Sequence, residues 1–182
     1  MNAIAALSPY SSSLGKSNVE RHTLSVLVDN EPGVLARVVG LFSGRGYNIE
    51  SLTVAEVAHG EHLSRITIVT AGTPEVIEQI SHQLERIVPI HKVTDLSVQA
   101  KVIERELAMI KVHGAGDHRS EALRLAEAFR AKVIDATIQS FIFELTGSPT
   151  KIDDFVELMR PIGLVEVSRT GVAAITRGAK GM

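Results

Sequence analysis

Cysteine and tryptophan are absent from the 182 residues of this chain, and aromatic residues make up only 4% of it. Without cysteine, the chain cannot form disulfides, use a thiolate nucleophile or bind zinc or an iron–sulfur cluster through sulfur. Scarce aromatic rings leave few platforms on which bases or sugars could stack. These absences fit an ordinary cytoplasmic protein, which is the location we expect.

An excess of positive charge is also lacking. The 19 Lys and Arg residues face 21 Asp and Glu residues, so the formal net charge is -2. Such a balance does not favour binding to phosphate backbones or to an anionic membrane surface. Charged residues also interrupt every apolar run before it reaches the roughly 20 residues that a membrane helix requires. We therefore expect neither nucleic acid nor a membrane as a partner.

The apolar content, by contrast, is that of a folded protein. Hydrophobic residues make up 45% of the chain and charged residues 22%, a composition typical of globular domains. The length allows one ordinary domain or two small ones. Residues 1–20 begin with a stretch rich in Ser, Ala and Asn, and we expect them to form a mobile tail.

The first half of the chain has the periodicities of a βαββαβ unit. Apolar residues alternate in the expected strands and recur at helical spacing in the expected helices. A proline at the first helical position and a glycine after the last mark helix ends. The predicted elements are a strand at His22–Asp29, a helix at Val34–Arg45, strands at Ile49–Val57 and Leu63–Ala71, a helix from Thr73-Pro74 to before Pro89, and a strand at Ile90–Leu96.

The same order recurs in the second half. Its predicted elements are a strand at Glu106–Val112, a helix at Arg119–Phe129, strands at Ala131–Thr137 and Ser140–Thr146, a helix that starts at Ser148-Pro149, and a strand at Leu164–Thr170. A βαββαβ order folds as an antiparallel sheet with two helices on one face, the ferredoxin-like arrangement. The sequence therefore predicts an α+β protein of two ferredoxin-like βαββαβ domains, at residues 21–98 and 104–182.

The loop Asn30-Glu31-Pro32-Gly33, followed by Val34-Leu35, carries the most informative candidate site. It places free backbone amides at the N-terminus of a helix, which attracts anions. Gly33 allows a ligand to approach closely because it has no Cβ. A free amino acid could bind there, with its carboxylate on the amides, its ammonium on the Asn30 side-chain oxygen and its side chain on Val34 or Leu35. The residues alone favour a plainer interpretation, in which Asn30 and Gly33 shape the turn and Asn30 caps the helix.

The other candidate sites have plainer explanations. Asn48, between the first helix and the second strand, could reach a ligand or a second subunit, but the residues alone favour a simple Asn turn. His59 and His62, and Asp117-His118, lack further metal ligands nearby and fit solvent-exposed positions better than a metal site. The chain contains no nucleophile elbow, phosphate-binding loop or dinucleotide fingerprint. We expect no catalytic residue, no metal and no cofactor in this chain.

Four segments carry a more specific signal than their periodicity. They are LSVLVDNEPGVLARVVGLFSGRGYNIESLTV at Leu24–Val54, LSRITI at Leu63–Ile68, VIEREL at Val102–Leu107 and SRTGV at Ser168–Val172. The chain from about Arg21 onward closely resembles the small-subunit family of acetohydroxyacid synthase (acetolactate synthase), whose N-terminal part is an ACT domain. Residues Arg45–Val54 are what distinguish it from other ACT domains.

The resemblance implies a homodimer whose ACT domains at residues 21–98 pair side by side, with a site for valine or a related branched-chain amino acid at their interface. The implied effector contacts are Asn30, Gly33, Val34 and Leu35 of one chain and Asn48 and Ile49 of the other. It further implies that the chain activates a catalytic large subunit in branched-chain amino acid biosynthesis and confers feedback inhibition on it. Thiamine diphosphate, FAD and Mg would belong to that partner.

Three alternatives stay open at this point. An ACT-type amino-acid sensor that controls a different partner would be expected to carry a DNA-binding helix pair or a fused catalytic domain. A small enzyme using His113, Asp117 and His118 as acid–base groups would turn over substrate on its own. A purely structural dimer module would tolerate the loss of Asn30 without functional effect.

Overall fold

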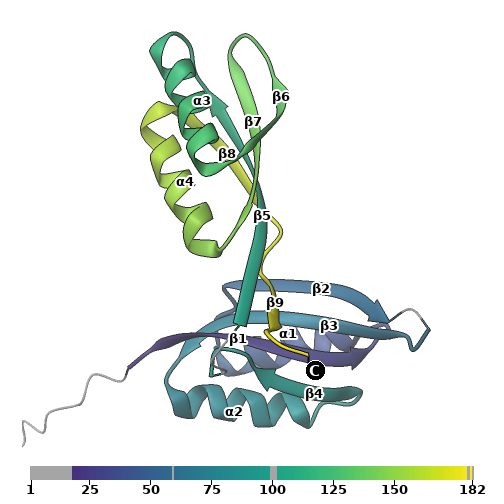
Figure 1. The fold of residues 1–182 in the computed structure, drawn as a ribbon. Coiled ribbons are helices and arrows are strands. Elements are labelled where there is room, and N and C mark those ends of the chain that lie inside the picture. The colour runs from purple at the N-terminus through teal and green to yellow at the C-terminus, as the bar shows by residue number, and fades with distance from the viewer. Residues whose placement is uncertain (1–17, 59, 99–101, 180, 182) are drawn as a thin grey trace, which may run out of the picture.

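The computed structural model describes residues 18–58, 60–98, 102–179 and 181. Two domains follow one another along the chain, as Figure 1 shows, and the long strand β5 rises from the first into the second. The predicted tail lies almost entirely at residues 1–17, outside the described residues, and the first strand already starts at Glu20. No helix in the described part of the chain has the length and apolar character needed to cross a membrane.

The N-terminal domain is the predicted βαββαβ unit. Its elements are β1 (Glu20–Asp29), α1 (Val34–Arg45), β2 (Ser51–Ala58), β3 (Leu63–Gly72), α2 (Pro74–Glu85) and β4 (Ile90–Asp95). The strands pair antiparallel in the order β2-β3-β1-β4, so β2 and β4 are the edges. Both helices cover one face of this sheet (Figure 1). The core between them is formed by Leu24, Val26, Val28, Val34, Val38, Phe42, Ile66, Ile68, Ile77, Ile80 and Leu84.

Local sequence sets the ends of the helices as predicted. Gly33 and Gly46 bracket α1, and both have the left-handed backbone conformation that glycine adopts without steric cost. The amides after the helix return to the carbonyls of Phe42 and Ser43. Thr73 caps α2 by accepting a hydrogen bond from the Val76 amide, with Pro74 at the first helical position.

The C-terminal domain repeats the arrangement. Its elements are β5 (Val102–His113), α3 (Asp117–Phe129), β6 (Lys132–Ala136), β7 (Ser140–Gly147), α4 (Pro149–Gly163) and β8 (Leu164–Arg169), with strand order β6-β7-β5-β8. This domain has its own core, which includes Phe141, Phe143 and Phe155. The prediction of two ferredoxin-like βαββαβ units is therefore confirmed.

A ninth strand, β9 (Ala173–Thr176), was not predicted. It pairs antiparallel with the first four residues of β5, from Val102↔Thr176 to Arg105↔Ala173. This two-stranded ribbon packs against the N-terminal domain through a small apolar cluster of Val69, Leu96, Val102, Val172 and Ala174. The C-terminal part of the chain thus returns to the face of the N-terminal sheet that the helices leave open. The predicted domain limits stay a prediction, and residues 99–101 at their boundary lie outside the described residues.

Candidate functional site

The turn before α1 is fixed by backbone hydrogen bonds and leaves open space beside its glycine. The Asn30 amide donates to the carbonyl of His62 at 2.6 Å, and the Glu31 amide donates to that of Asp29 at 2.9 Å. Gly33 has a φ of 88°, and apart from its two chain neighbours no residue has a heavy atom within 4 Å of the position that a Cβ would take. A ligand could therefore approach this backbone closely.

The first turn of α1 keeps two amides without a backbone acceptor among the described residues. The first helical hydrogen bond runs from the Arg37 amide to the Gly33 carbonyl at 3.1 Å, while the Val34 amide reaches the Glu31 carbonyl only at 3.5 Å. Within the described residues, the Leu35 and Ala36 amides have no backbone acceptor, and the first turn carries no acidic side chain. Such a helix end attracts a carboxylate.

Asn30 does not act as the cap of α1. The capping position is occupied by Gly33, which has no side chain to accept a hydrogen bond. Asn30 is exposed, and its side-chain amide makes no hydrogen bond within the part of the chain that the structure describes. The structure therefore leaves the Asn30 side-chain oxygen available to an ammonium group.

The two apolar candidates of this loop have different environments. Val34 is 2% exposed and belongs to the core of the N-terminal domain, so its side chain anchors the helix. Leu35 is 40% exposed and could contact a ligand. The sequence predicted either side chain as a ligand contact. Their different burial in the structure is what distinguishes them.

Asn48 and Ile49 lie at the opposite end of α1. The Asn48 carbonyl accepts a 2.6 Å hydrogen bond from the Thr70 hydroxyl, its side chain is exposed, and Ile49 packs on the edge of the core. The 12 residues of α1 rise by 1.5 Å each, so about 18 Å separate this loop from Gly33. One chain therefore does not bring the two groups of candidate residues together.

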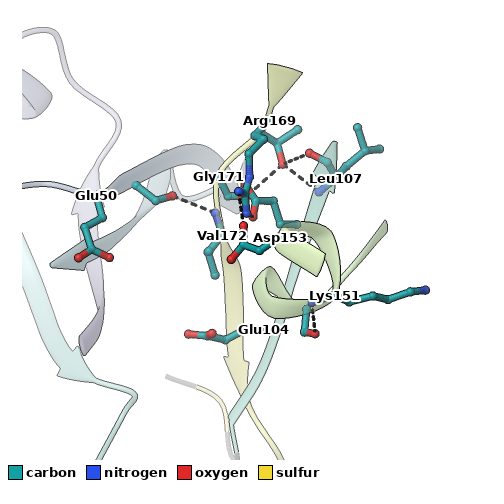
Figure 2. A network of polar contacts seen from close by, with 12 residues as sticks. Glu50, Glu104, Leu107, Lys151, Asp153, Arg169, Gly171 and Val172 are labelled. Carbon is teal, nitrogen blue, oxygen red and sulfur yellow. Dashed lines mark hydrogen bonds and ion pairs between the residues drawn. The ribbon is translucent and has the colours of Figure 1, made fainter. Parts of the chain in front are cut away.

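The junction between the two domains holds a polar network that sequence reasoning missed (Figure 2). Arg169 binds the buried carboxylate of Glu106 at 2.6 and 2.9 Å and the exposed carboxylate of Asp153 at 2.6 Å. Its hydrogen bonds to Glu106 are the main cause that raises the pKa of Arg169 above the ordinary value, and Asp153 adds to it. Arg21 of the N-terminal domain pairs across the junction with Glu104 on β5, and within its own domain with Glu50.

Of the residues considered for catalysis or metal binding, His118 makes a structural contact. His118 Nδ1 lies 2.9 Å from the Ile162 carbonyl, a contact between α3 and the end of α4. The described residues include no group of three or more His, Cys, Asp or Glu side chains placed to hold a metal ion. His59 lies outside the described residues, so the pair His59 and His62 is not seen together.

The first of the two ferredoxin-like units, with its glycine-led helix start, is an ACT domain by comparison with known families. The N-terminal part, residues 24–92, matches the model of the AHAS small subunit-like ACT domain. Residues 105–178 match the model of the small subunit of acetolactate synthase. The chain belongs to the acetolactate synthase small-subunit family.

Individual relatives agree over nearly their whole length. The chain is 45% identical over 161 residues to the acetolactate synthase isozyme 3 small subunit of Escherichia coli, covering 88% of this chain and 98% of that protein. It is 42% identical over 175 residues to the acetolactate synthase small subunit of Aquifex aeolicus, covering 96% and 90%. The crystal structure of the Thermotoga maritima small subunit superposes with a TM-score of 0.79 at 38% identity, over 88% of this chain and 99% of that one.

Proposed function

We propose that this chain is the non-catalytic regulatory subunit of an acetolactate synthase, which activates the catalytic large subunit and inhibits it when valine or a related amino acid binds. The observation that carries the proposal is the start of α1. There, unpaired amides, an available Asn30 side chain and an exposed Leu35 surround open space at Gly33.

The chemistry of these groups suits a free branched-chain amino acid. The Leu35 and Ala36 amides would donate to its carboxylate, the Asn30 oxygen would accept from its ammonium, and Leu35 would contact its apolar side chain. A zwitterion carries no net charge, so recognition by neutral groups needs no charged partner on the protein. The absence of an acidic residue from the first turn keeps that end open to a carboxylate.

A second copy of the chain would complete the site. Asn48 and Ile49 are too far from Gly33 within one chain, so they would contribute from the partner of a homodimer. Strand β2 supports such pairing, because it is an edge of the N-terminal sheet and carries Val54 and Val57, which are 43% and 50% exposed. Edge strands with exposed apolar residues are prone to pair with another chain.

Regulation would then proceed by allosteric coupling to the large subunit. Coupling free energies between sites are typically about 1–3 kcal/mol, which a modest rearrangement of paired domains can supply. Thiamine diphosphate, FAD and Mg would be bound by the large subunit, and the assembly would act in the cytoplasm.

Loss of the Asn30 side chain should weaken effector binding without unfolding the domain. In isothermal titration with valine, leucine and isoleucine, we expect saturable binding by the native chain and at least about tenfold weaker binding by Asn30→Ala, because a hydrogen bond to a charged group contributes about 1.5–3 kcal/mol. Asn18→Ala, an exposed asparagine before β1, is the matched control and should bind as the native chain does. Equal affinity of Asn30→Ala and the native chain would remove Asn30 from the site.

A further inference from the structure

The residues Thr170–Val172, hereafter the junction segment, connect β8 to β9 and contact both domains. The Val172 amide donates to the Ser51 hydroxyl at 3.1 Å, and the Thr53 hydroxyl donates to the Thr170 carbonyl at 3.3 Å. Both hydroxyls belong to β2 of the N-terminal domain. Figure 2 shows Gly171 and Val172 between β2 on one side and the Arg169 network on the other.

Gly171 makes this contact unusually close. Its φ is 81°, and a Cβ at this position would lie 2.7 Å from both the Ser51 Oγ and the Thr53 Oγ1. Side chains do not tolerate such distances, so only glycine fits between the junction segment and β2. Because the contact is this close, a movement of the two β2 hydroxyls toward Gly171 would displace the junction segment.

The junction segment is bound as firmly to the C-terminal domain. The Thr170 amide donates to the Leu107 carbonyl at 3.0 Å, and the Leu107 amide donates to the Thr170 hydroxyl at 3.2 Å. The preceding residue, Arg169, binds Glu106 on β5 and Asp153 on α4. A shift of the junction segment would therefore act on β5, β8 and the start of α4 together.

Strand β2 begins at Ser51, two residues after Ile49, which is one of the proposed effector contacts. Ser51 follows Asn48 by three residues, at most about 10 Å of extended chain. The loop between them is tied to β3, since the Asn48 carbonyl accepts from Thr70 and the Glu50 amide donates to the Val69 carbonyl at 2.8 Å. Movement at Asn48 thus has a short, ordered path to Ser51 and Thr53.

We propose that the junction segment couples the effector site to the C-terminal domain, with the Ser51 and Thr53 hydroxyls as the positioning contacts. This inference rests on the proposed function, since it takes Asn48 and Ile49 to contact the effector. Two of the four segments that carry the family resemblance, Val102–Leu107 and Ser168–Val172, meet at this junction. In this proposal, the two segments hold the two domains in a fixed position relative to each other.

The test separates effector binding from effector response in the full chain. The double variant Ser51→Ala/Thr53→Val removes both hydroxyl contacts and leaves the proposed effector residues unchanged. We expect it to bind valine, leucine or isoleucine within about twofold of the native chain by titration. In complex with a catalytic large subunit, the effector-induced change in the rate of acetolactate formation should fall at least about fivefold, the lower end of usual allosteric coupling. Thr146→Val, an exposed threonine on β7, is the matched control and should respond as the native chain does.

Gly171→Ala tests the same contact by forcing it apart, and it should also reduce the effector-induced change. If that variant fails to fold, the hydroxyl variant still decides the question. An undiminished response in the double variant would overturn the coupling role, and so would a loss of effector binding, because Ser51 and Thr53 would then belong to the site itself. Absence of binding by the native chain would overturn the proposed function, and this inference with it, before any variant is made.

Discussion

Gly33→Asp is expected to abolish effector binding while the protein stays folded. The new carboxylate would occupy the open space beside the amides and repel the carboxylate of the effector. Asp adopts the left-handed conformation of this position at modest cost, and the φ of Gly33 is 88°. We expect binding of valine, measured by titration, to weaken at least about a hundredfold, which corresponds to about 2.8 kcal/mol.

Gly33→Asn is the matched control for that charge. Asparagine has the size of aspartate and also tolerates a left-handed backbone, but it carries no negative charge. It should weaken binding less than Gly33→Asp does, and both variants should activate the large subunit as the native chain does. If Gly33→Asp bound valine as tightly as the native chain, the effector carboxylate could not lie at the start of α1.

Phe155→Ala is expected to destabilise the C-terminal domain and leave the ACT domain folded. Phe155 is fully buried and packs against Phe129 and Phe143, with ring centroids 5.2 and 6.0 Å away. Truncation of a buried phenylalanine costs about 3–5 kcal/mol. For a domain of this size that lowers the melting temperature by more than about 12 °C, which differential scanning calorimetry would detect.

The two separate cores make this prediction specific. Phe155 belongs to the core of the C-terminal domain. The core of the ACT domain is formed by a separate set of buried residues. We therefore expect effector binding to persist at temperatures where the C-terminal domain has unfolded. Leu158→Ala, on the same helix and 43% exposed, should change the melting temperature little. Loss of effector binding at the temperature where the C-terminal domain of Phe155→Ala unfolds would mean that the two domains unfold as one unit.

Local sequence was sufficient to predict most of the fold. The alternation of Leu24, Val26 and Val28 predicted β1, and all three are buried. The ends of the helices followed from Gly33, Gly46 and the prolines that open α2 and α4, since each acts through its own backbone. The repeated βαββαβ order then predicted the two sheets.

Strand β9 could not be predicted in the same way. It has only four residues, and its partner residues Val102–Arg105 lie about 70 positions earlier in the chain. Periodicity within a window of residues does not reveal such a long-range pairing. For the same reason the contacts of Gly171 with Ser51 and Thr53 became visible only in three dimensions.

The candidate effector site was predictable in part. The residues identified the loop at Gly33 as a helix start with open amides, and the structure has that geometry. The sequence did not show that Val34 is turned into the core, because valine at this position fits both a core contact and a ligand contact. The contribution of Asn48 and Ile49 depends on a second chain and stays a prediction.

The most direct test of the account is reconstitution with a catalytic large subunit of acetolactate synthase. The rate of acetolactate formation would be compared for the large subunit alone, with this chain added, and with this chain and valine added. We expect no activity of this chain by itself, a higher rate when it joins the large subunit, and a return toward the lower rate with valine. A large-subunit rate that does not change when the chain is added, or turnover by the chain alone, would contradict this expectation.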